Sequence, residues 1–131
     1  MRNDEELERL IRSKDAVDTM ILRAQMALEH EEYFRSLNVD RDVPAYLDAV
    51  LMQLGQIGEA CSASKLPAET RDEYDCIDWR QINGFRNVAY HQYEAVDYDT
   101  VWMIVDDLLE GLIEDLIEVS EDLSNRISML E

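Results

Sequence analysis

Apolar residues repeat at steps of three and four along most of the chain, and this spacing predicts long amphipathic helices. One stripe runs through residues 4–35, a second through residues 43–61, and a third begins at Tyr98. The third keeps its spacing to Leu130 without a miss, as in a heptad seam. No stretch shows the alternation expected of a strand. The pattern predicts an all-α fold whose last turns, beyond about Ser120, project or fray.

Polar segments separate these stripes. Residues 62–77 are predicted to form a loop with a short helical turn around Glu69 to Asp75. Asp78, with Gln81 three residues later, resembles a capping box at the start of a further helix. We therefore expect a single domain, residues 1–131, folded as a four-helix up-and-down bundle with one optional short accessory helix.

Two glycines lie inside the second stripe. Gly55 and Gly58 each cost a helix about 1 kcal/mol relative to alanine, so we expect them to permit the close approach of another helix. Gly84, later in the chain, is expected to let a helix or a nucleotide approach the backbone in the same way.

The charge of the chain is strongly negative, at -18 over 131 residues. Residues 94–131 carry one basic and twelve acidic side chains, and we interpret them as a solvated helix face that keeps the protein soluble. Such a surface repels a polyanion such as RNA. The sequence has no run of about eighteen apolar residues, and its start is acidic, which predicts a cytoplasmic protein without a membrane partner.

The residues that commonly bind metals are sparse. Cys61 and Cys76 lack metal-ligand spacing, and we expect two reduced thiols packed near the core. His30 lies among glutamates, where a charged helix end in water explains it better than a metal site. We expect no metal and no cofactor.

Residues 86–93 crowd a guanidinium, an amide, an imidazole and two phenols into one short segment. On a helix, Asn87 and His91 share one stripe, while Arg86 and Tyr93 share the adjacent one. Arginine offers a fixed charged fork for phosphate oxygens, and histidine can transfer a proton near neutral pH. This combination favours chemistry on a phosphate.

The arrangement Arg86-x4-His91-x-Tyr93, with Asn87 after the arginine, resembles the signature of HepT-like toxins in the HEPN superfamily. Other short motifs follow in the order of that family, and the resemblance spans roughly residues 43 to 105: Ile57-Gly58-Glu59-Ala60, Trp79, Ile82-Asn83-Gly84-Phe85 and Val101-Trp102. It implies an HEPN-like helical bundle, a homodimer and a composite, metal-independent ribonuclease site.

Cleavage of RNA by its own 2′-hydroxyl needs a base, an acid and positive charge at the phosphorus. Arg86 and His91 supply one set, as phosphate clamp and acid/base, and Asn87 would orient them. A two-fold axis through the motif helices would supply a second His91. Glu59 is either a solvent-facing acid or, as the resemblance implies, a neighbour of the arginine and histidine.

The resemblance also implies a partner. In HepT-like pairs a minimal nucleotidyltransferase antitoxin of the MntA type adds AMP to the tyrosine that corresponds to Tyr93, which would make this chain the toxin of a type II toxin–antitoxin system. A simpler interpretation is that Tyr93 only closes the helix. Two other classes of function stay open. One is a non-catalytic helical binding module that partners a minimal nucleotidyltransferase. The other is a plain helical dimer in which Arg86, Asn87 and His91 form a buried polar network.

Overall fold

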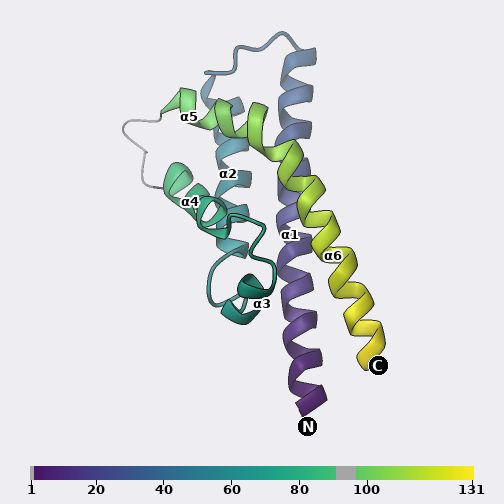
Figure 1. The fold of residues 1–131 in the computed structure, drawn as a ribbon. Helices are drawn as coiled ribbons and strands as arrows, with labels where there is room; N and C mark the ends of the chain where they lie inside the picture. The colour runs from purple at the N-terminus through teal and green to yellow at the C-terminus, as the bar shows by residue number, and fades with distance from the viewer. Residues whose placement is uncertain (1, 91–96) are drawn as a thin grey trace.

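The computed structural model describes residues 2–90 and 97–131, and this part of the chain is all-α, as predicted. Long helices lie side by side in the bundle, and shorter helices cross beside them (Figure 1). The elements are α1 (Arg2–Ser36), α2 (Pro44–Ala60), α3 (Ala68–Glu73), α4 (Trp79–Tyr90), α5 (Tyr98–Met103), the π-helical η1 (Ile104–Leu108) and α6 (Leu109–Leu130). The predicted four-helix bundle with an accessory helix is confirmed.

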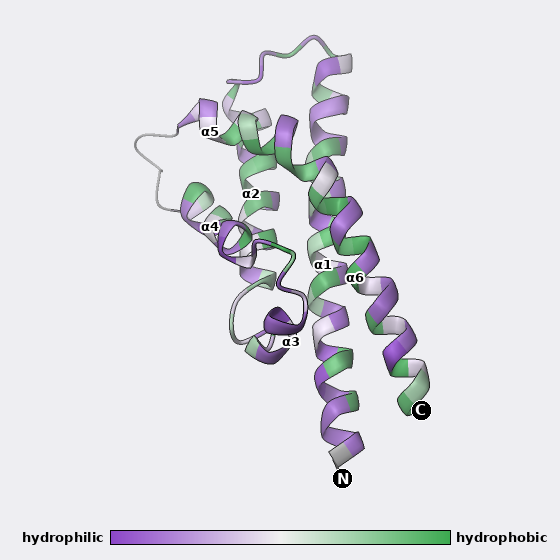
Figure 2. Ribbon diagram, in the orientation of Figure 1, coloured by the Kyte–Doolittle hydropathy of each residue, from purple (hydrophilic) through white to green (hydrophobic). Residues whose placement is uncertain are grey.

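Helix α1 is the longest element, and it packs against both α2 and α6. Its predicted apolar stripe is buried at Leu10, Val17 and Ala24. Green apolar positions of α1, α2 and α6 gather where these helices meet, and purple polar positions lie outside (Figure 2). The hydrophobic core therefore lies along α1, which carries α2 on one side and α6 on the other.

The end of α6 corrects one prediction. The turns beyond Ser120 remain helical to Leu130, and Leu123 is completely buried. The hydroxyl of Ser120 donates a hydrogen bond to Asp18 on α1. Because α1 is long enough to lie beside α6, the apolar seam finds a partner within the same chain and has no reason to fray.

The seam is also interrupted, which its regular spacing did not predict. Residues 104–108 form a π-helical turn between α5 and α6. Before this turn, Trp102 donates a hydrogen bond to Asp42 and lies under the guanidinium of Arg41, 4.1 Å from the ring centre. Helix α5 contacts the connection between α1 and α2, whereas α6 lies along α1. The wider π-helical turn changes the path of the backbone between them, so that both sets of contacts can form.

Helix α4 begins as predicted. The carboxylate of Asp78 accepts a hydrogen bond from the backbone N–H of Gln81 at 3.0 Å, which caps the first turn. Trp79, Ile82 and Phe85 form the buried side of the helix. Asn87 lies on the opposite, exposed side of α4, whereas Arg86 lies at the edge of the buried side and is half-buried.

Both cysteines are free, but only one is in the core. Cys61 is buried, and this burial raises the pKa of its thiol to about 11. Cys76 is exposed, so the prediction of two core thiols is wrong for this residue, because the neighbouring Ile77 is the one that enters the core. Within residues 2–90 and 97–131 no three metal-binding side chains come together, and no helix is both long and apolar enough to cross a membrane.

Candidate ribonuclease site

Arg86 is positioned by an unusually close contact between α2 and α4. A Cβ atom on Gly58 would lie 2.5 Å from Cγ and 2.7 Å from the backbone nitrogen of Arg86. A Cβ on Gly55 would lie 2.6 Å from the hydroxyl oxygen of Tyr90, one turn further along α4. At Gly58 the clash would be with the backbone of α4, which confirms the predicted close helix approach there. At Gly55 the close atoms belong to the end of the Tyr90 side chain, which can move aside.

Glu59 contacts Arg86 directly. Its Oε2 lies 3.2 Å from Nε of the arginine, and its Oε1 lies 3.9 Å from Nζ of Lys65. The side chains of Arg86 and Glu59 are 43% and 35% exposed, so the pair contributes at most about 1 kcal/mol to stability. Its main effect is on orientation, because Nε is engaged while the two terminal nitrogens of Arg86 have no partner among the described residues.

Asn87 follows Arg86 on the exposed side of α4, without a hydrogen-bond partner in the described part of the chain. No side-chain hydrogen bond joins it to Arg86 or Glu59 there. In the single chain neither Arg86 nor Asn87 is buried. A buried polar network of these residues would therefore require a second molecule to cover them.

His91 and Tyr93 lie outside the described residues, and α4 is described as far as Tyr90. The structure consequently brings together Arg86 and Glu59 out of the five predicted site residues. Around Gly84 an added Cβ would meet nothing within 4 Å, so no helix of the described residues approaches there, contrary to one of the two expectations for that glycine.

Sequence reasoning missed two features of this site. Lys65 reaches Glu59 from the loop after α2, and no periodicity marks a residue of a loop as a neighbour of α4. Tyr90 packs on Gly55 with 47% of its surface exposed, which places an accessible aromatic ring one helical turn from Arg86. The pairing of Tyr90 with Gly55 could not be read from spacing along one helix.

The fold and the glycine-seated arginine define an all-α protein of the HEPN-like class. Residues 24–123 match the family described as "Ribonuclease HepT-like". The chain belongs to this HepT-like ribonuclease family.

Three relatives illustrate the likeness. A candidate RNase of Methanocaldococcus jannaschii, MJ1216, is 36% identical over 75 residues, which cover 57% of this chain and 54% of the relative. A gamma-glutamylcyclotransferase and candidate RNase of the same organism, MJ0434, is 32% identical over 76 residues, or 58% of this chain and 33% of the relative. A candidate RNase of Caldanaerobacter subterraneus, TTE0752, is 34% identical over 59 residues, or 45% of this chain and 51% of the relative.

The matched segments thus span between a third and about half of the length of these relatives. No solved structure matches the chain.

Proposed function

We propose that this protein is the toxin of a toxin–antitoxin pair and acts as a metal-independent endoribonuclease. The observation that carries the proposal is the seating of Arg86. Its backbone is held against Gly58 and its Nε against Glu59, while its terminal nitrogens point to no protein partner in the described chain. A guanidinium fixed in this way can bind two oxygens of one phosphate. The family to which the chain belongs and the names of its relatives support RNA as the source of that phosphate.

In the proposed reaction the 2′-hydroxyl of a ribose attacks the adjacent phosphorus. A base takes the proton of this hydroxyl, and an acid gives a proton to the departing 5′-oxygen, which leaves a 2′,3′-cyclic phosphate. His91 serves as one of these groups, and Arg86 stabilises the negative charge on the non-bridging oxygens. Asn87 orients the reacting groups, and Glu59 keeps Arg86 in place.

Two proton-transfer groups are needed, and each chain offers one suitable histidine. His30, the other histidine, is half-buried on α1, with Nε2 3.4 Å from the amide nitrogen of Gln53, and is engaged away from Arg86. We therefore propose a homodimer in which two His91 residues complete the site. Two chains of 15.3 kDa each should sediment as one species of about 30 kDa, whereas a strict monomer would contradict the shared site.

Cleavage of a labelled single-stranded RNA by the purified protein tests the proposal. Arg86→Ala and His91→Ala should each reduce the rate at least about a hundredfold, because each removes a group that acts on the reacting phosphate. Arg80→Ala is the matched control, since Arg80 is an exposed arginine of the same helix without an ion pair in the described chain. A chelator should leave the rate unchanged. Protein that cuts no RNA, or His91→Ala protein that cuts like the parent, would exclude the nuclease.

We further propose that an MntA-type minimal nucleotidyltransferase silences the toxin by adding AMP to Tyr93. A phosphodiester next to Arg86 carries a negative charge that can occupy the guanidinium in place of RNA. Incubation with an MntA-type nucleotidyltransferase and ATP should add mass in steps of one AMP. The addition should disappear in Tyr93→Phe and persist in Tyr90→Phe, a control that removes the nearby exposed phenol. Full inhibition without modification would mean that the antitoxin acts by binding alone.

A second candidate function is a non-catalytic helical module that binds a minimal nucleotidyltransferase. The net charge of -18 favours it, because an acidic surface opposes RNA binding. In this module the same motif holds the nucleotidyltransferase, so Arg86→Ala and His91→Ala should weaken that binding while the parent cuts no RNA. The nuclease assay and a binding titration of the two alanine variants therefore separate the two functions.

A further inference from the structure

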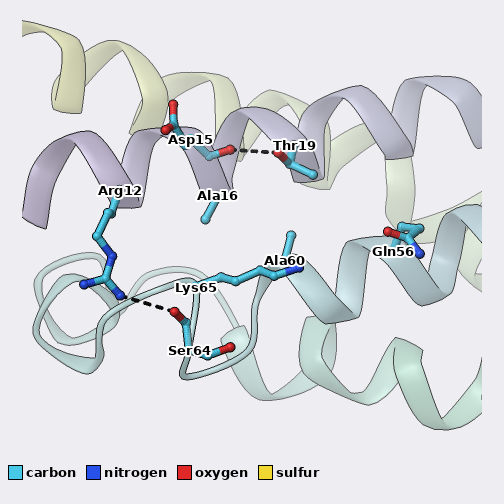
Figure 3. Close-up of a pocket in the computed structure, with 8 residues that line it drawn as sticks. All are labelled: Arg12, Asp15, Ala16, Thr19, Gln56, Ala60, Ser64 and Lys65. Atoms are coloured by element: carbon cyan, nitrogen blue, oxygen red, sulfur yellow. Dashed lines mark hydrogen bonds between the residues drawn. The ribbon is translucent and has the colours of Figure 1, made fainter.

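A surface pocket of about 280 Å³ lies between α1, the end of α2 and the loop that follows α2. Arg12 on α1 and Lys65 on the loop supply its cations, and Asp15 supplies one carboxylate (Figure 3). Thr19, Gln56 and Ser64 add neutral polar groups, with small alanines between them. The lining offers hydrogen-bond donors and acceptors around a space with a net positive charge.

This charge sets the pocket apart from other hollows of the described surface. One of them, near the start of α1 and α3, is lined by four glutamates and a single arginine. Two others, beside α6, contain carboxylates and no cation. On a protein with a net charge of -18, a hollow with more cations than anions is the place where a phosphate meets least repulsion.

The cations of the pocket retain free donors. One terminal nitrogen of Arg12 donates a hydrogen bond to the carbonyl of Ser64 at 3.2 Å, and no carboxylate lies within ion-pair distance of Arg12 among the described residues. Lys65 is 54% exposed, and its only ion pair in the described chain is the long one with Glu59. Both side chains can therefore accept an anion without first breaking a strong salt bridge.

The pocket is also connected to the candidate ribonuclease site. Lys65 lines the pocket and lies 3.9 Å from Oε1 of Glu59, whose other oxygen lies 3.2 Å from Arg86. One carboxylate thus separates the cation of the pocket from the guanidinium of the site. A single strand that places one phosphate at Arg86 can reach Lys65 and Arg12 with the next part of its backbone.

We propose that this pocket binds a nucleotide of the RNA strand that flanks the cleaved phosphate. Arg12 and Lys65, whose charged ends point in different directions (Figure 3), each bind a phosphate of the strand, and Asp15 and Gln56 line the space for its ribose or base. The inference rests on the proposed ribonuclease function and assigns the path of the substrate beyond Arg86. It predicts that long RNA binds more tightly than a dinucleotide and that the difference depends on Arg12.

Binding of a 2′-O-methyl RNA of about twelve nucleotides, which resists internal attack, tests the path. Arg12→Gln and Lys65→Gln should each weaken its binding about threefold to tenfold at low salt and lower the slope of affinity against salt by about 0.7. Arg12→Gln should slow cleavage of a long RNA more than cleavage of an RNA dinucleotide, because a dinucleotide lacks the additional phosphate that Arg12 binds. The control is Lys14→Gln, which makes the same charge change on the opposite side of α1. Lys14 pairs with the partly exposed Asp18, so its removal should be tolerated.

The outcomes separate this inference from the proposed function. One outcome is that the parent protein cleaves RNA and that Arg12→Gln and Lys14→Gln bind the long strand with equal affinity. The pocket is then not part of the RNA path, while the proposed ribonuclease function is retained. If the parent neither binds nor cleaves RNA, both the RNA path and the proposed ribonuclease function are wrong. A third outcome is that the parent binds AMP, that Arg12→Gln abolishes AMP binding, and that the same substitution does not change the affinity for RNA. The pocket would then be a site for a free nucleotide, and the proposed RNA path would be wrong.

Discussion

Gly58 is the residue on which the position of Arg86 most directly depends. Gly58→Ala would place a methyl group 2.5 Å from the arginine side chain and 2.7 Å from its backbone nitrogen, so α4 must move. We expect a loss of about 1–3 kcal/mol in the free energy of unfolding. RNA cleavage should fall together with it, because Arg86 shifts with α4.

Gly111→Ala is the control for this change. Gly111 is a helical glycine of α6 that would meet nothing within 4 Å, and its replacement should stabilise the protein by up to about 1 kcal/mol. Thermal unfolding measures both effects. A Gly58→Ala protein as stable and active as the parent would show that the α2–α4 contact is not needed.

Glu59 has two opposing effects on a phosphate at Arg86. It orients the guanidinium through Nε, and its negative charge repels the substrate. Glu59→Gln should therefore lower KM, through weaker repulsion, and lower kcat about tenfold, through looser positioning. Steady-state kinetics at constant salt measures the two separately, and a fall in kcat/KM with unchanged kcat would contradict the orienting effect.

The residues of the site differ in how far the sequence revealed them. Gly55 and Gly58 were predictable, because glycine inside a helix is costly and signals close packing. The motif singled out Arg86 as a candidate phosphate clamp, which stays a prediction. Lys65 and Arg12 were not predictable, because ion pairs and pockets between a loop and a distant helix depend on tertiary packing, which leaves no period in the sequence.

At the level of the helices, apolar spacing predicted the elements and their buried sides but not the π-helical turn. Steps of three and four describe which positions are apolar along the last helices, and they continue through residues 104–108. The backbone widens there because Trp102 on α5 is attached to Asp42, while Leu123 on α6 is buried beside α1. Such a conflict between two attachments arises only once the helices are packed.

Glu73 is one of the residues that attach the accessory helix α3 to the bundle, together with the buried Thr70, which is hydrogen-bonded to Ser13 on α1. Glu73 accepts hydrogen bonds from Arg9 on α1 at 2.6 Å and from Arg126 on α6 at 3.0 Å. These bonds, chiefly the one from Arg9, lower the pKa of Glu73 below its ordinary value. A carboxyl with a lowered folded-state pKa stabilises the fold above its unfolded-state pKa, and this contribution disappears as the pH falls through the folded-state value.

Glu73→Gln should therefore reduce the free energy of unfolding by about 1 kcal/mol at pH 7, where the partly exposed pair is screened by solvent. The deficit should vanish in acid, below the folded-state pKa of the parent carboxyl. Glu114→Gln, an exposed change of equal charge on α6, is the comparison. Denaturant melts of the three proteins across this range measure the effect, and a deficit independent of pH would refute the assignment.

For the whole molecule, the charge of -18 makes salt act in opposite directions on folding and on RNA binding. Salt screens the repulsion within the acidic chain, so Tm should rise by a few degrees between about 50 and 200 mM salt. RNA affinity should fall over the same range, because counterions compete for Arg86 and its neighbours. Differential scanning and fluorescence anisotropy on one set of samples give both trends. A Tm that falls with salt would mean that attractive ion pairs outweigh the repulsion.

The two contacts between α4 and α2 determine which mutations a genetic selection against activity should recover. With a single contact, α4 could slide along α2 or rotate about its own axis, and a second contact prevents both motions. Gly58 meets Arg86 and Gly55 meets Tyr90, in antiparallel order along the two helices. The position of Arg86 therefore depends on the two glycines of α2. If the protein is toxic as proposed, a genetic selection for cells that survive its expression should collect substitutions at the two glycines as well as at Arg86, and suppressors of Gly55→Ala should replace Tyr90 by a smaller side chain.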